Sequence, residues 1–293
     1  MNMERNQSLW GDAWQRLKKN RIAMACLSLV VLFTVLAVYG EVLYRYHDIK
    51  DTTPAYQNTD LDMAFKAPSS KHWMGTDGLG RDVMARLVQG VSIAYKVGII
   101  TSLIAIPIGV FFGCIAGYFG GKVDDFVVWL YSTFASMPGL LFILAIAMVV
   151  GKGLLGIYLG IGLTTWVGIC RLMRGEVIKH KGQTYVLAAQ ALGLSSGRII
   201  FRHILPNVMH VIIVTFTLRF PAAVGTEVFL SFLGIGVQDQ PSWGLMINSA
   251  RMRLWQGIWW EMTFVTLAVF LLVLAFNLLG DALRDALDPR LND

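Results

Sequence analysis

The run "VSIAYKVGIITSLIAIPIGVFFGCIAGYF", residues 91–119, decides the fold class of this chain. It contains one charged residue, Lys96, close to its N-terminal end. A helix needs about 20 apolar residues to cross the roughly 30 Å hydrocarbon core of a bilayer. The run is therefore predicted to be a transmembrane helix, and Lys96 can snorkel to the interface without any special role.

Five further runs of this kind are spread along the 293 residues, of which 55% are hydrophobic and 15% charged. Soluble domains carry about 25% charged residues, so the composition indicates a membrane protein. We predict an all-α integral membrane protein with six transmembrane helices, whose even number places both termini on one side. The expected spans are Ile22–Gly40, Val91–Phe119, Asp125–Val150, Leu154–Cys170, Asn207–Ile235 and Met262–Gly280.

Small residues recur at every fourth position in the second span, at Gly109, Gly113, Gly117 and Gly121. Such spacing lets another helix approach closely. It predicts tight packing against a neighbour, which the spacing alone cannot assign to this chain or to another.

The basic residues beside the spans set the expected orientation. They gather on the side that holds both termini and residues 171–206, which is therefore predicted to be cytoplasmic. The net charge of +6 is therefore expected to favour contact with anionic lipid headgroups and not to indicate nucleic-acid binding. Before the first span, Leu9, Trp10, Ala13, Trp14 and Leu17 share one helical face, which predicts an interfacial helix on the inner leaflet.

Two charged residues lie within the fifth span, where a charge is costly. Arg219 and Glu227 are about two helical turns apart, with Pro221 between them as an expected kink. They are candidates for a water-accessible pathway between helices. The alternative is a structural polar contact, which is favoured for Arg219 and about as plausible as the pathway for Glu227.

Catalytic and cofactor motifs are absent from the sequence. Residues 119–125, "FGGKVDD", lack the upstream glycine and the following Ser or Thr of a phosphate loop. His203 and His210 have no further ligands at metal-binding spacing, and the three cysteines lie in apolar runs. We therefore expect no catalytic residue, no metal and no cofactor in this chain.

The polar stretch "YVLAAQALGLSSGRIIFRHILPN", residues 185–207, interrupts the apolar runs. We predict a helix over residues 185–194 that Gly193 ends, then a second helical piece from Ser195, a candidate N-cap, to Pro206. Ala188, Ala189 and Ala191 give the first helix a small-residue face. That face can be covered by another protein or can rest on lipid, and the physical pattern alone does not choose.

Several motifs resemble those of permease subunits of binding-protein-dependent ABC importers. "AAQALG" (residues 188–193) with "ILPN" (204–207) looks like the cytoplasmic coupling loop of that family, although Leu187 stands where the signature has Glu. The resemblance to C-type subunits of oligopeptide and dipeptide importers extends over most of the chain. It is carried by "MGTDGLGRDVMARLVQG" (74–90), "AGYFGGKVDD" (116–125), "RLMRGEV" (171–177), "FLSFLGIGVQ" (229–238), "PSWG" (241–244) and "NLLGDALRDALDPR" (277–290).

The resemblance implies a type I ABC importer permease fold in a bacterial inner membrane. The implied partners are a second homologous permease, two ATP-binding subunits that hydrolyse the ATP, and a periplasmic or extracellular peptide-binding protein. Residues 1–90 would hold the interfacial helix, the first span and a periplasmic loop. Residues 91–281 would form the transporter domain, with its coupling loop at 171–206. Residues 282–293 would form a cytoplasmic tail. The implied ATPase contacts are Tyr185, Ala188, Ala189, Gly193, Leu194 and Ser195.

Two alternatives to peptide import remain at this point. One is an importer of nickel or another small solute within the same superfamily. The other is an ion-driven secondary transporter, which would be expected to show inverted repeats and broken helices with paired charges at the midplane. No convincing repeat is visible in the sequence.

Overall fold

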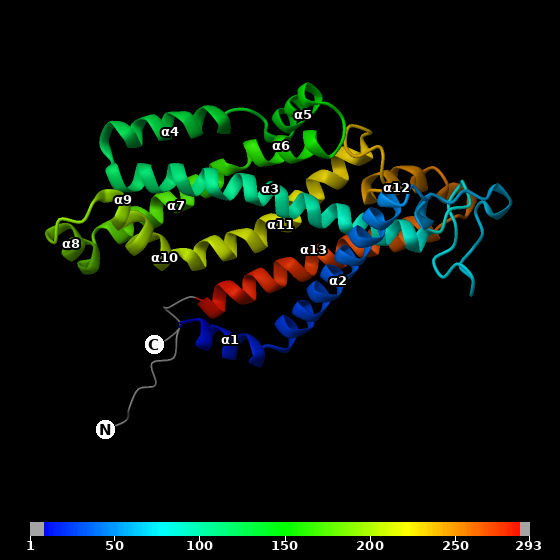
Figure 1. Ribbon diagram of the computed structural model, residues 1–293, viewed down its shortest axis with the longest axis horizontal. Coiled ribbons are helices and arrows are strands. Elements are labelled where there is room, and N and C mark those ends of the chain that lie inside the picture. Colours follow the sequence, from blue (N-terminus) through cyan, green and yellow to red (C-terminus); the bar gives the residue numbers. More distant parts are fainter. Residues whose placement is uncertain (1–8, 288–293) are drawn as a thin grey trace. The chain divides into compact units, whose positions relative to one another are not determined.

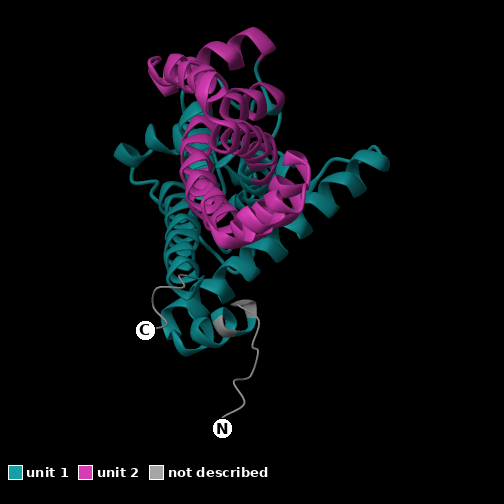
Figure 2. Ribbon diagram, turned by 90° about the vertical axis from the view of Figure 1, so that its left-hand side faces the viewer, with its two compact units in different colours: residues 1–98, 152–154, 220–293 teal, residues 99–151, 155–219 magenta. Residues whose placement is uncertain are grey.

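A computed structural model describes residues 9–287 (Figure 1). Within these residues the secondary structure is helical, and the single β-bridge joins Thr76 to Asp82. The chain forms two compact units, which Figure 2 colours separately. Unit 1 comprises residues 1–98, 152–154 and 220–293, and unit 2 comprises residues 99–151 and 155–219.

Unit 1 is built around two long apolar helices, α2 and α13, that pack against each other. Its helices are α1 (Leu9–Lys19), α2 (Arg21–Ile49), α12 (Trp243–Arg251) and α13 (Trp260–Leu287), with the start of α3 (Val83–Phe119) and the end of α11 (Met209–Phe232). Short 3₁₀ turns lie at Ala55–Gln57, Leu61–Met63 and Leu254–Gln256. Of the expected tail, residues 282–287 continue α13, and residues 288–293 lie outside the described part.

The N-terminal helix α1 folds back on α2 and α13. Asn20 separates α1 from α2, and its Oδ1 accepts hydrogen bonds from the backbone N–H groups of Ile22 and Ala23, so it caps α2. Ala13 and Leu17 are buried, whereas Trp14 stays exposed under the ammonium group of Lys18. Part of the expected interfacial face therefore packs on protein. Leu9 and Trp10 are outside the described side chains.

Unit 2 holds the remaining helices. They are α4 (Gly121–Ala135), α5 (Gly139–Val150), α6 (Leu154–Thr164), α7 (Trp166–Lys181), α8 (Thr184–Ala191), α9 (Ser196–Ile199), a π-helical turn (Ile200–Ile204) and α10 (Leu205–Asn207), with the rest of α3 and α11.

The glycine row of α3 packs against α7 within this chain. A Cβ on Gly109 would stand 2.5 Å from the Cβ of Ile169, and one on Gly113 would stand 2.7 Å from the Cβ of Met173. Gly117 meets Arg174 and Val177 in the same way. The close approach expected from the spacing is confirmed for these three glycines. Gly121 instead has open space around it and a φ of +53°, where α4 begins.

Within residues 9–287, five helices are long and apolar enough to cross a membrane. They are α2, α3, residues 154–181 across α6 and α7, α11 and α13. The segment expected as a continuous third span, residues 125–150, is instead a pair of helices, α4 and α5, bent by 85°. Pro138 explains the break, because proline disfavours helical geometry in the residue before it and donates no N–H. Counting the bent pair as one span gives six.

Candidate functional site

The helix α8 lies beyond the end of α7 and is held by one buried side (Figure 1). Val186 and Ala189 are buried in the same apolar cluster as Ile199, Ile200 and Ile204. The spacing of three residues between Val186 and Ala189 places both on one face of the helix. That face fixes α8 to unit 2 and leaves the opposite face free.

Gly193 ends α8 in a Schellman motif. The N–H of Leu194 donates to the carbonyl of Ala189 at 3.2 Å, and the N–H of Gly193 donates to the carbonyl of Gln190 at 2.9 Å. Gly193 has a φ of +74°, and no atom lies within 4 Å of the place where its Cβ would stand. The glycine is therefore required by the backbone conformation and not by packing.

The second helical piece differs from the expected continuous helix. Ser195 occupies the N-cap position with extended geometry, but its side chain makes no capping hydrogen bond. One helical turn, α9, is followed by the π-helical turn and then by α10, which contains Pro206. Proline cannot donate to the carbonyl four residues earlier and crowds it, which accounts for the irregular hydrogen bonding before this residue.

The outward surface of this segment is mainly apolar, with Gln190 as an exposed polar residue within it. Leu187 is 52% exposed and Leu192 is 81% exposed, and Ala188 and Ala191 are also exposed. Of the expected contact residues, Ala188, Gly193 and Ser195 are exposed, whereas Tyr185 and Leu194 are half-buried. Ala189 is buried, so it supports the helix from within. Leu192 was not among the contact residues expected from the sequence. Its position next to Gly193, which ends the helix, could have indicated that it is exposed.

Tyr185 ties the start of α8 to the end of α7. Its hydroxyl group lies 2.8 Å from Nδ1 of His180. Burial raises the pKa of Tyr185, so the phenol stays protonated at neutral pH. The contact bridges the short turn between the two helices.

The helix α7 is in turn fastened to α4. The Arg174 guanidinium donates two hydrogen bonds of 2.5 Å to the two carboxylate oxygens of Asp124. The guanidinium of Arg171 lies over the ring of Tyr131, 4.8 Å from its centroid. Together with the glycine contacts to α3, these interactions make α7 the support to which α8 is attached.

Arg219 contacts Thr165, the residue between α6 and α7. Its guanidinium donates to the Thr165 carbonyl at 2.7 Å and to the Thr165 hydroxyl. Arg219 therefore makes a polar contact within unit 2, of the kind that the structural alternative expects, while its pathway role stays a prediction.

Glu227 lies in unit 1 and is 1% exposed. The hydroxyl of Ser231 donates to its Oε1 at 2.6 Å and accepts from the backbone N–H of Val237 at 3.1 Å. Glu227 is therefore held in a buried hydrogen-bonded chain that fixes the end of α11. Arg219 belongs to unit 2 and makes separate contacts.

Lys96 has a partner that the sequence did not reveal. Its ammonium group forms an ion pair with Glu41 of α2 and lies over the ring of Tyr44, 5.2 Å from the centroid. The pair joins α2 to α3 within unit 1.

Comparison with known proteins identifies the family. Residues 109–293 match the model for the binding-protein-dependent transport system inner membrane component, and residues 8–68 match the N-terminal transmembrane domain of oligopeptide transport permease C.

Curated relatives match over nearly the whole chain. A dipeptide transport system permease protein of Bacillus subtilis is 42% identical over 96% of this chain and 85% of the relative. An oligopeptide transport system permease protein of the same organism is 38% identical over 98% and 92%. A glutathione transport system permease protein of Pectobacterium atrosepticum is 36% identical over 96% and 91%.

Solved structures agree on the fold. The inward-facing MetNI methionine ABC transporter matches with a TM-score of 0.53 and 19% identity, over 70% of this chain and 97% of that one. Because a family model covers more than half of the chain and relatives above 30% identity span nearly all of it, this chain belongs to the inner membrane components of binding-protein-dependent transport systems.

Proposed function

We propose that this chain is a permease subunit of an ATP-driven importer of dipeptides or oligopeptides. The names of its relatives support this substrate class over nickel and over ion-driven transport. In this assignment it pairs with a second homologous permease, rests on two ATP-binding subunits and receives peptide from an external binding protein. The chain itself catalyses no reaction, because ATP is hydrolysed by its partners.

The observation that carries the coupling role is the exposed face of α8 on a firmly held base. Leu187, Ala188, Ala191 and Leu192 offer a surface that another protein can cover with little steric hindrance. The opposite side of α8 is buried against unit 2, so a push on the exposed face is transmitted to α7. We infer that closure of the ATP-binding subunits moves α8 and with it the helices of unit 2.

Gly193→Val tests this role. A β-branched residue is strained at φ +74°, so the Schellman turn should open and move Leu192 and Leu194. We expect peptide uptake to fall at least about tenfold while the chain still inserts, since a 1.4 kcal/mol loss of coupling corresponds to a factor of ten. Uptake by membrane vesicles and co-purification of the ATP-binding subunits are the measurements.

Gly182→Val is the matched control. Gly182 also has open space at its Cβ position but has an ordinary φ of −83°. This variant should keep most of the uptake. Full uptake by Gly193→Val, or uptake that collapses with a proton uncoupler while ATP is maintained, would contradict the assignment.

A further inference from the structure

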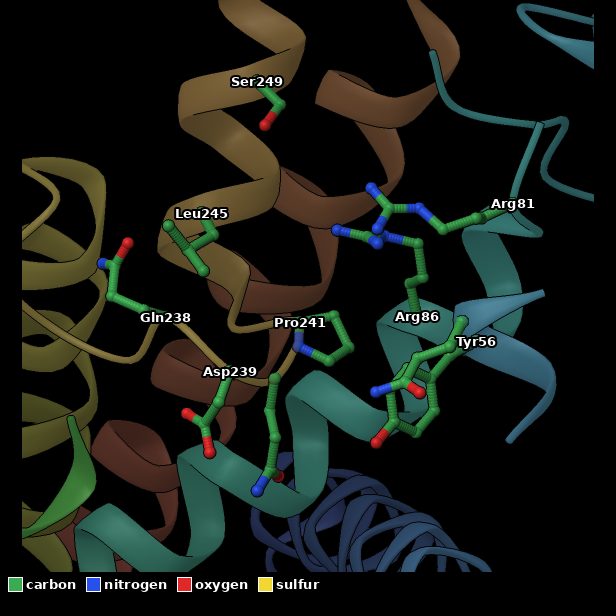
Figure 3. Close-up of a pocket in the computed structure, with 10 residues that line it drawn as sticks. Tyr56, Arg81, Arg86, Gln238, Asp239, Pro241, Leu245 and Ser249 are labelled. Carbon is green, nitrogen blue, oxygen red and sulfur yellow. The ribbon is translucent and has the colours of Figure 1, made fainter. Parts of the chain in front are cut away.

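A cavity of about 290 Å³ lies in unit 1, in the part of the chain expected on the outer side of the membrane (Figure 3). Its walls come from the loop between α2 and α3, the start of α3, the segment leading into α12, and α12 itself. The side chains around it are predominantly polar or charged. They are Tyr56, Gln57, Arg81, Arg86, Gln238, Asp239, Gln240, Pro241, Leu245 and Ser249.

Two arginines in the wall share one carboxylate. Nε of Arg81 donates to Oδ2 of Asp77 at 2.8 Å, and Nε of Arg86 lies 3.4 Å from the same oxygen. Figure 3 shows the two guanidinium groups next to each other at one side of the cavity. Oδ1 of Asp77 is already used by the backbone N–H groups of Leu79 and Arg81. One carboxylate thus serves two cations.

Arg86 is 7% exposed, and its Nε donates no hydrogen bond to any described residue. Two buried acids, Asp77 and Glu261, act on Arg86, but its Nε is left without a hydrogen bond, so an added acceptor for this guanidinium group would be favoured. Glu261 is the other buried acid close by, but its Oε1 accepts no hydrogen bond from the described residues. Both arginines line the cavity, and a guanidinium group can bind a carboxylate in bidentate geometry.

Tyr56 adds a second unsatisfied donor to the wall. It is 6% exposed, and its hydroxyl has no hydrogen-bond partner among the described residues. Burial raises the pKa of Tyr56 to about 12, so the hydroxyl keeps its proton and can donate to an acceptor.

The cavity also has an acidic side. Asp239 is exposed, and Figure 3 places it across the cavity from the two guanidinium groups. One hollow therefore presents cations at one side and an anion at the other. This distribution is complementary to a small molecule that carries both a carboxylate and an ammonium group.

We propose that this cavity binds a small zwitterion of the amino-acid or short-peptide type, with its carboxylate at Arg81 and Arg86 and its ammonium group toward Asp239. This assigns a ligand site to the permease chain itself. It is independent of the coupling role of α8.

Equilibrium binding tests the site without ATP or transport. The assembled transporter, without its external binding protein, is placed in lipid nanodiscs and titrated with dialanine by saturation-transfer NMR. Dialanine amide lacks the carboxylate, and N-acetyl-dialanine lacks the ammonium group. We expect the amide to bind about tenfold more weakly than dialanine, because it loses a charge-assisted pair with arginine.

Variants locate the two ends of the ligand. Arg86→Gln should weaken dialanine binding by about tenfold and reduce the preference over the amide, because Arg81 alone remains for the carboxylate. Lys71→Gln removes an exposed cation from the same segment but outside the cavity, and should change neither. Tyr56→Phe removes one hydroxyl and should weaken dialanine binding by a smaller factor.

Asp239→Asn covers the case in which Arg86→Gln fails to assemble, because Asp239 is exposed and substitution there leaves the interior intact. It should abolish the preference for dialanine over N-acetyl-dialanine. The proposal is overturned if the parent transporter does not bind dialanine or binds dialanine and its amide equally. It is also overturned if Arg86→Gln or Asp239→Asn assembles and keeps the parent's preferences.

Discussion

Substitutions of the buried Glu227 can distinguish a role in packing from a role in the transport pathway. Its Oε1 accepts from Ser231, which also holds the N–H of Val237. Gln has the same shape and keeps a carbonyl oxygen that can accept the hydrogen bond from the Ser231 hydroxyl. We therefore expect Glu227→Gln to retain peptide uptake within about twofold, since a retained hydrogen bond costs little.

Glu227→Leu is the informative comparison, because it leaves the Ser231 hydroxyl without its acceptor. We expect it to lower the free energy of unfolding by about 1–3 kcal/mol, measured as a lower Tm of the detergent-solubilised transporter. If Glu227→Gln instead lost uptake with an unchanged Tm, Glu227 would belong to the pathway.

At the same scale, the sequence predicted residue types better than residue partners. Gly193 was expected to end a helix, and its backbone geometry follows from glycine chemistry alone. The pairing of Lys96 with Glu41 was missed because the two residues are far apart in sequence and only the packing of α2 against α3 brings them together. The buried position of Ala189 was likewise hidden, because alanine fits both an exposed and a buried face.

Among the elements, α7 connects the packed interior of unit 2 to the exposed α8. The bidentate contact between Arg174 and Asp124 joins it to α4, with both side chains mostly shielded from solvent. Asp124→Asn keeps the shape but removes the charge, so we expect a loss of about 1–2 kcal/mol in unfolding free energy, less than for a fully buried pair. A lower Tm and reduced uptake per assembled transporter would be measured.

The exchanged double variant, Asp124→Arg with Arg174→Asp, is the control for this contact. It restores opposite charges at the two positions. Its Tm should therefore be higher than expected from adding the losses of the two single variants, Asp124→Arg and Arg174→Asp. A double variant no better than the sum of the two single changes would show that α4 and α7 are not coupled through this pair.

The helices themselves were predictable where apolar length decides and less so where backbone chemistry intervenes. The apolar runs located α2, α3, α11 and α13, but only α11 (Met209–Phe232) agrees closely at both ends. The helix α2 continues from the expected Gly40 to Ile49, α3 begins at Val83 instead of Val91, and α13 continues from Gly280 to Leu287. The run at residues 125–150 is equally apolar, yet Pro138 divides it into α4 and α5. The π-helical turn before Pro206 was missed for a similar reason. A hydropathy pattern carries no information about the backbone N–H group that proline lacks.

For the whole molecule, the sequence predicted an all-helical membrane fold, and family membership and the MetNI likeness confirm it. The division into two units was not predicted. α3 and α11 each contribute to both units, so a continuous apolar helix gives no sign of the boundary at residues 98 and 219. Only long-range packing defines that boundary.

The orientation of the molecule remains a prediction from its charge distribution. Basic residues beside spans favour the cytoplasmic side, so both α1 and the α8 segment should face the cytoplasm and residues 41–90 should face outward. Single cysteines at Lys19, Ser195 and Lys71, all exposed, can report this with a membrane-impermeant maleimide. Cys26, Cys114 and Cys170 are buried, so the parent chain supplies a low background.

In intact spheroplasts, Lys71→Cys should react, whereas Lys19→Cys and Ser195→Cys should react only after the membrane is permeabilised. The reason is that the charged maleimide cannot cross the bilayer, so it reaches only cysteines on the outer side of an intact membrane. Labelling of Ser195→Cys without permeabilisation would place α8 on the outer side, where no ATP-binding subunit could reach it. The same experiment therefore tests the orientation and the side of the membrane on which coupling must occur.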